Sequence, residues 1–195
     1  LNALSSPSFD AVYINSSFSD SQSNYNCRYL TNLKADTVVF GESVTSIPAY
    51  LLNDNKNVKK IIIKGSPTSI GSNICQSTGS VTHIYVVDGT TAQKITGPVA
   101  NTNIVFVIGN GATVDEGTDK SEFSAVSKDG YIATWYEYDS SIAEYSGYSN
   151  KQPVTTVETG KTYIAVWATC NHRTKTYAAE GDKLTESCAD CGHVF

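Results

Sequence analysis

The stretch from Val38 to Val87 decides the fold. It reads VVFGESVTSIPAYLLNDNKNVKKIIIKGSPTSIGSNICQSTGSVTHIYVV. One unit is written nearly twice and begins a third time, because the apolar pair Val38/Phe40 recurs as Ile61/Ile63 and again as Ile84/Val86, each step being 23 residues. A fixed period of this length is typical of a solenoid, whose stacked units bury an apolar face that no single unit can bury alone. We therefore expect a mainly β fold with short helical turns, organised around this solenoid.

The residues between these apolar pairs form two outward columns. Successive side chains of a strand point to opposite faces, and stacked strands lie about 4.8 Å apart, so six outward side chains are predicted to make one contiguous patch. Solenoids commonly bind through such a face, and the patch is a predicted partner surface. The alternative is that β-branched residues stand there only because they favour strands. The six residues are Thr37, Val39, Lys60, Ile62, His83 and Tyr85.

The repeat resembles the BspA-type leucine-rich repeats of bacterial surface proteins. The match lies in Glu42-Ser43-Val44-Thr45-Ser46-Ile47 and in its second copy, Thr68-Ser69-Ile70-Gly71. It departs from the family pattern at Leu51 and Ile74, where the family has Ala-Phe. The resemblance implies a leucine-rich-repeat solenoid and a place on a cell surface, and it implies no particular ligand.

Composition narrows the possible partners. The net charge of −5 gives no electrostatic support for a nucleic-acid partner, and the absence of an apolar run of 18 residues predicts no membrane span.

The sequence contains no Met, so we expect a mature or trimmed fragment from which any signal peptide has been removed. Five cysteines cannot all pair within one chain. Cys27 and Cys75 are predicted to be free, mostly buried thiols.

The rest of the chain divides around the repeat. Residues 1–110 are predicted as the solenoid, with a divergent first repeat that includes a strand over 9–14, a short helix over 90–96 and a closing strand over 103–108. Residues 111–121 are acidic and poor in apolar side chains, which favours a solvated linker over a pair of catalytic carboxylates, because adjacent Asp115 and Glu116 point opposite ways in an extended chain.

Residues 122–169 are rich in aromatic side chains. Two strand-like runs, Tyr131–Tyr136 and Thr162–Trp167, flank a polar segment. The pattern G-Y-x-x-x-W-Y followed by V-x-x-G-x-T-Y-x-A-x-W resembles the Listeria–Bacteroides repeat of bacterial surface proteins, which implies a small β-grasp-like domain. The aromatic cluster is predicted to be the core of that sheet, with carbohydrate stacking as the alternative.

The tail, residues 170–195, holds the one constellation that looks like a site. Cys170, His172, Cys188 and Cys191 supply three thiolates and one imidazole, a ligand set that suits tetrahedral Zn²⁺, and His193 is a rival fourth ligand. Cys-x-x-Cys-Gly is one half of many zinc sites because Gly permits the tight turn. The stretch also resembles short C-x-H…C-x-x-C-G modules at the ends of bacterial surface proteins. The alternatives are a disulfide of Cys170 with Cys188 or Cys191, and a disordered tail.

These observations predict a non-enzymatic interaction or adhesion module of a bacterium, extracellular or attached to the cell wall. Its expected partner is a protein or glycan on a host or neighbouring cell, with no nucleic acid, and its expected cofactor is at most one structural zinc. The alternatives are a carbohydrate-binding accessory region of a larger surface enzyme and a structural spacer. Exposed aromatic residues after position 121 favour the first alternative, whereas an exposed apolar ladder on the solenoid favours the interaction module.

Overall fold

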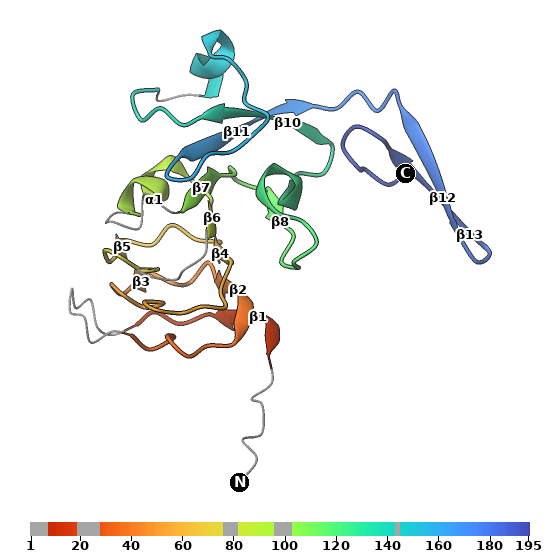
Figure 1. The fold of residues 1–195 in the computed structure, drawn as a ribbon. Helices are drawn as coiled ribbons and strands as arrows, with labels where there is room; N and C mark the ends of the chain where they lie inside the picture. Colours follow the sequence, from red (N-terminus) through yellow and green to blue (C-terminus); the bar gives the residue numbers. More distant parts are fainter. Residues whose placement is uncertain (1–7, 19–27, 76–81, 96–102, 143–144) are drawn as a thin grey trace.

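Parallel strands stack into a solenoid-like coil in the computed structural model of the chain, which describes residues 8–18, 28–75, 82–95, 103–142 and 145–195 (Figure 1). Each turn of the coil contributes one short strand, which we call a rung, to the sheet. The rungs are β1 (Phe9–Ile14), β2 (Ala35–Phe40), β4 (Lys60–Ile63), β6 (His83–Val86) and β7 (Ile104–Val107).

The pairing register follows the 23-residue period. Val38 lies opposite Ile61, and Ile61 lies opposite Ile84. A second, smaller ladder joins β3 (Ser46–Ile47) to β5 (Ser69–Ile70), with Ile47 opposite Ile70. The predicted solenoid-like stacking is therefore confirmed, and the strand expected over 9–14 is its first described rung.

The inward side chains of the rungs build the first core. Val38, Ile61 and Ile84 are fully buried, and Leu51 and Ile74 from the turns pack against them. The turns approach so closely that a Cβ at Gly71 would overlap the backbone nitrogen of Ala49. This contact explains why the second copy of the repeat carries glycine there.

The sheet does not end at β7. Strand β11 (Thr162–Thr169) pairs in parallel with β7, and β10 (Tyr131–Glu137) pairs antiparallel with β11. The order in the resulting seven-stranded sheet is β1-β2-β4-β6-β7-β11-β10. Residues 103–108 do form a strand, as predicted, but they do not close the sheet, and residues 111–121 do not separate two sheets.

Short elements complete the body of the molecule. Helix α1 (Gly89–Lys94) lies where a helix over 90–96 was predicted, and the Asp88 carboxylate caps it by accepting from the Thr91 N–H at 2.7 Å. No helix in the described part of the chain is long and apolar enough to cross a membrane. The remaining elements are β8 (Thr113–Val114), η2 (Glu122–Ala125), β9 (Val126–Ser127) and η3 (Tyr145–Asn150).

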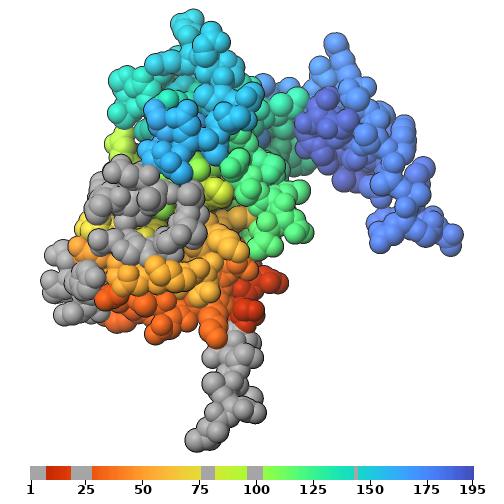
Figure 2. Space-filling model, viewed as in Figure 1, coloured from red at the N-terminus to blue at the C-terminus, as the bar shows by residue number. Residues whose placement is uncertain are grey.

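A two-stranded ribbon follows the sheet and stands away from the body (Figures 1 and 2). It consists of β12 (Lys175–Glu180) and β13 (Lys183–Cys188), paired antiparallel. Every residue of β12 is exposed. An isolated two-stranded ribbon is at best marginally stable in water, so its base needs an additional constraint.

Two cysteines lie outside the tail, Cys27 and Cys75. Cys75 is a free, buried thiol, as predicted, and burial raises its pKa to about 12. Cys27, predicted to be similar, lies outside the described residues.

Candidate metal centre and the covered sheet face

The predicted partner surface is aligned as expected, but it is not an exposed patch. Lys60 lies opposite both Thr37 and His83, and Ile62 lies opposite both Val39 and Tyr85. All of these except His83 are buried, with exposed fractions from 0 to 4%, and His83 is half-buried. The prediction of an exposed apolar ladder is therefore wrong, because residues 109–127, which we call the cover, lie over this face.

A buried lysine fastens the cover to the sheet. The Lys60 ammonium donates to the backbone carbonyl oxygens of Asp115 at 2.6 Å, Gly117 at 2.6 Å and Lys120 at 3.0 Å. The Thr37 hydroxyl donates to the Glu116 carbonyl at 2.9 Å. Residues 111–121 are thus not a solvated linker. Their acidic composition misled the prediction, since the sheet is held by their backbone carbonyls.

The outward side chains belong to a second core. Tyr85 stacks on Phe106 with ring centroids 4.8 Å apart, and Trp135 stacks on Phe123 of the cover at 4.7 Å. Tyr163 is also buried in this cluster. The aromatic residues after position 121 that line this core therefore serve packing, which is the role predicted for the aromatic cluster. Burial lowers the pKa of the Lys60 ammonium, while the Asp115 and Glu116 carboxylates oppose that shift.

One signal for this second core was present in the sequence. The runs VVF, III, IYVV and IVFVI do not alternate between apolar and polar residues. A parallel sheet that is buried on both faces reads as such continuous apolar runs. The hydrogen-bonding role of Lys60 had no comparable signal in the sequence, because lysine side chains usually lie at the protein surface.

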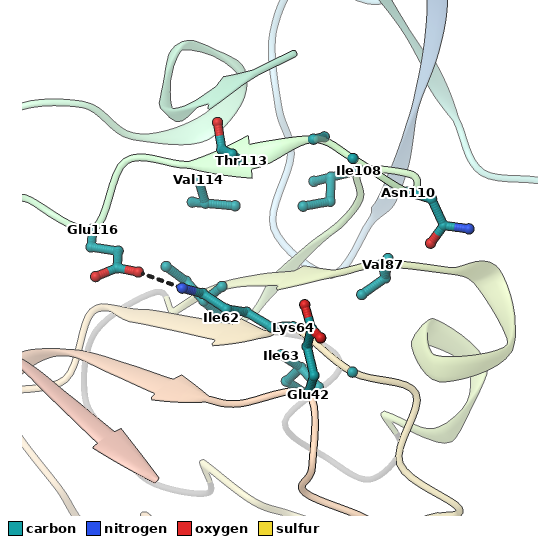
Figure 3. Close-up of a pocket in the computed structure, with 13 residues that line it drawn as sticks. Glu42, Ile62, Ile63, Lys64, Val87, Ile108, Asn110, Thr113, Val114 and Glu116 are labelled. Atoms are coloured by element: carbon teal, nitrogen blue, oxygen red, sulfur yellow. Dashed lines mark hydrogen bonds and ion pairs between the residues drawn. The ribbon is translucent and has the colours of Figure 1, made fainter. Parts of the chain in front are cut away.

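A cleft of about 800 Å³ opens where the strand ends meet the cover (Figure 3). Ile62 and Val87 line it from the sheet and Val114 from the cover. The Lys64 ammonium and the Glu116 carboxylate pair across it at 2.9 Å. This ion pair joins the cover to the sheet, and among the described residues no histidine, cysteine or second lysine lines this space.

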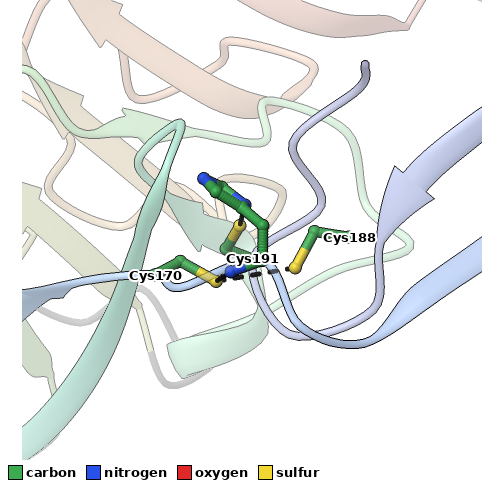
Figure 4. A group of neighbouring side chains, drawn as sticks. Cys170, Cys188 and Cys191 are labelled. Carbon is green, nitrogen blue, oxygen red and sulfur yellow. Dashed lines mark hydrogen bonds between the residues drawn. The ribbon is translucent and has the colours of Figure 1, made fainter.

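Four side chains of the tail converge at the base of the ribbon (Figure 4). One ligand atom from each of Cys170, His172, Cys188 and Cys191 lies within 4.8 Å of each of the others. The Cys170 and Cys188 sulfurs are 3.5 Å apart, and the Cys191 sulfur is 3.4 Å from His172 Nδ1. The cluster predicted from sequence spacing is therefore assembled in the structure and can hold a metal ion.

Local turns aim these ligands at one point. Gly192 adopts a φ of +74°, and its N–H donates to the Cys188 carbonyl at 2.8 Å, which closes the Cys-x-x-Cys turn. On the other side of the site, the Cys170 N–H donates to the Gly130 carbonyl at 2.9 Å and ties the cluster to the start of β10. His172, the second residue after Cys170, also has positive φ, at 52°.

The rival ligand lies elsewhere. His193 Nδ1 is 2.7 Å from the Asp129 carboxylate, in the turn before β10. The Cys188 N–H donates to the His193 carbonyl at 2.8 Å, so the backbone of His193 supports the cluster while its ring serves as a clamp to the body. His172 is the imidazole of the cluster.

Ionisation within the cluster is uneven. Burial opposes ionisation of Cys188, but donors from the Cys191 and Asp190 backbone and the His172 side chain outweigh it and lower the Cys188 pKa to about 6. Cys170 accepts from the His172 N–H, yet burial and the adjacent Cys191 and Cys188 raise the Cys170 pKa to about 11. A cation among the sulfurs would favour all the thiolates together.

The donor set can hold a metal ion. Zn–S bonds of about 2.3 Å in a tetrahedron place sulfurs about 3.8 Å apart. The Cys170 and Cys188 sulfurs lie 3.5 Å apart, which is compatible with this arrangement. Three sulfurs and one imidazole suit a soft or borderline ion such as Zn²⁺ rather than Ca²⁺ or Mg²⁺, which prefer oxygen ligands.

No protein-family model, curated protein or solved structure shows significant similarity to this chain.

Proposed function

We propose that the protein is a non-enzymatic interaction module of a bacterial cell surface, in which one structural zinc fixes a projecting ribbon to the body. The observation that carries this proposal is the convergence of four protein ligands at the base of a two-stranded ribbon, of which one strand is exposed throughout. Zinc bound by Cys170, His172, Cys188 and Cys191 would supply cross-linking rather than chemistry.

The ligand count supports a structural role. Catalytic zinc sites have three protein ligands and keep a position for water or substrate, whereas structural sites are closed by four. All four positions of a tetrahedron would be filled here by side chains of this chain. Removing the metal would leave a ribbon with almost no buried surface to hold it in place.

The repeat architecture supports the interaction role. Solenoids present extended surfaces to other macromolecules, and the sequence resembles BspA-type leucine-rich repeats and the Listeria–Bacteroides repeat, both of bacterial surface proteins. We therefore place the protein outside the cytoplasm, with a protein or glycan partner on a host or neighbouring cell. The buried solenoid ladder does not add to this support. Exposed aromatic side chains that could contact a partner include Tyr131 and Tyr145, which are 37% and 46% exposed.

Metal content tests the first half of the proposal. We expect about one zinc per chain by mass spectrometry of the native protein, with the tail thiols unreactive until a chelator is added. Hydrogen exchange should show that the Lys175–Cys188 ribbon loses protection on chelation while β4 and β6 keep theirs. Metal-free protein with two thiols missing would instead establish a disulfide and contradict the zinc.

Binding to cells tests the second half. Fluorescently labelled protein should bind saturably to intact bacteria or epithelial cells in flow cytometry. The matched control is the protein unfolded by heat and carrying the same label. Equal signals from both preparations, or signal from neither, would contradict the interaction role.

A further inference from the structure

A groove runs between the sheet and the metal cluster. Its floor is formed by one face of β10 and β11, where Tyr131, Ala133 and Trp135 alternate along β10 and Trp167 lies opposite Ala133. One wall comes from Phe123 and Val126 of the cover and from Lys128, the residue that follows it. The other wall is the Asp190-Cys191 turn of the metal cluster. The groove therefore joins three segments that are far apart in the sequence.

The aromatic floor is held rigidly. The Trp167 indole N–H donates to the Ile108 carbonyl at 2.7 Å, and this bond fixes the ring in its plane. Trp135 is 6% exposed and stacks on Phe123. The Lys128 ammonium lies 4.7 Å from the centre of the Tyr131 ring and donates to the Asn110 carbonyl at 3.0 Å. Trp135 is itself buried, so the surface open to a ligand comes from half-buried Trp167 and exposed Tyr131. Rings held in place in this way lose little conformational freedom on binding.

The groove has three polar side chains, Ser127, Lys128 and Asp190, among its lining residues. Asp190 is exposed at the rim and, among the residues that the structure describes, forms no ion pair. The Lys128 ammonium is already bonded to Asn110. A free carboxylate accepts hydrogen bonds and repels anions, while the Lys128 ammonium in the same lining repels cations. Together the two charges favour a neutral ligand rich in hydroxyl donors.

We propose that this groove binds one ring of a neutral saccharide. A sugar ring has an apolar C–H face, which suits the floor of Tyr131 and Trp167, and a hydroxyl edge, which suits Asp190. The space is about 230 Å³, below the roughly 300–1,000 Å³ of sites for drug-sized ligands, so it has room for a single ring. The assignment rests on the proposed function, since zinc at Cys191 would hold the second wall in place.

Intrinsic fluorescence is a direct probe of this site. The chain contains two tryptophans, and both line the groove. Titration with neutral oligosaccharides, namely cellotriose, mannotriose, xylotriose and triacetylchitotriose, should change the emission saturably for at least one of them. Isothermal calorimetry then gives the affinity. No saturable response to any of the four at millimolar concentration would overturn the proposal.

Matched variants identify the contacts. Tyr131→Ala and Asp190→Asn should each weaken binding by about tenfold, the upper range for one aromatic or charge-assisted contact. Tyr177→Ala and Asp182→Asn change exposed residues of the same types on the ribbon, and both should bind as the unchanged protein does. Equal loss in the groove and ribbon variants would contradict the site.

The metal and the saccharide can fail separately. Zinc content and saccharide affinity are measured on the same samples, and Tyr131→Ala should keep its zinc. Zinc without saccharide binding would overturn the groove and leave the metal centre standing. Saccharide binding that needs Tyr131 in a protein without zinc would support the groove and contradict the metal centre. With both present, chelation should lower the affinity by about tenfold, and an unchanged affinity would remove the second wall from the proposal.

Discussion

Replacing Lys60 by Met should detach the cover from the sheet. Methionine fills a similar volume but cannot donate, so the carbonyls of Asp115, Gly117 and Lys120 lose their common partner. Three hydrogen bonds from a charged donor are worth together about 4.5–9 kcal/mol. Residue Lys60 is only 4% exposed, and desolvation of its ammonium, which costs several kcal/mol, opposes that sum. We expect a net loss of about 2–4 kcal/mol in the free energy of unfolding.

Urea unfolding followed by circular dichroism measures this loss, and hydrogen exchange locates it. Protection should fall at residues 112–121 and persist in β4 and β6. Lys59→Met is the matched control, because the Lys59 side chain is 65% exposed and pairs with Asp36 at the surface, where such pairs contribute about 0–1 kcal/mol. If Lys60→Met is as stable as Lys59→Met and keeps its protection, the three carbonyl contacts do not hold the cover.

Three further changes test other parts of the structure. Trp135→Ala should lower the free energy of unfolding by about 3–5 kcal/mol because it leaves a cavity in the second core. The control is Ile132→Ala, at a residue 39% exposed on the opposite face of β10, which should change that free energy by about 0.5 kcal/mol or less in the same urea titration. Equal effects of the two substitutions would contradict the covered face. Gly71→Ala should cost about 1–3 kcal/mol because its Cβ meets the Ala49 backbone, and a thermal midpoint equal to that of the unchanged protein would contradict the close stacking of turns. In metal-free protein, ultraviolet absorbance of the thiolates should show a titration step near pH 6, and this step should be absent in Cys188→Ser. Because folding lowers the Cys188 pKa from 9.0, the stability that this thiolate contributes is complete above pH 9, declines as the pH falls, and is lost below about 6. A midpoint near 9 would show that the cluster does not assemble without metal.

The 23-residue period predicted the rungs because equivalent residues of successive repeats lie opposite each other in a parallel stack. The register that aligns Val38 with Ile61 by subtraction is the register of the sheet. The same arithmetic placed Lys60 in an outward column but could not say what covers that column. The covering residues carry no apolar run, and they accept from Lys60 through backbone carbonyls, which are common to every residue type.

The tail was predictable for a different reason. Metal ligands are few in kind, and the spacing of Cys188 and Cys191 before Gly192 specifies a turn from sequence alone. The choice between His172 and His193 depended instead on a distant residue, because Asp129 in the turn before β10 pairs with His193. That contact joins residues 64 positions apart, so no local pattern in the sequence indicates it. The aromatic groove was hidden for the same reason, since its walls come from separate segments.

The parallel pairing of β11 with β7 also sets the order in which the protein can be made. On a ribosome, β1 to β7 can stack as each repeat emerges, but the outer edge of β7 stays unpaired until β11 has been synthesised. At about 5–20 residues per second the connecting segment takes roughly 3–10 s. An open parallel edge is a template for pairing with another chain. During these seconds the nascent chain depends on dilution or on a chaperone to keep β7 available for its own last strands.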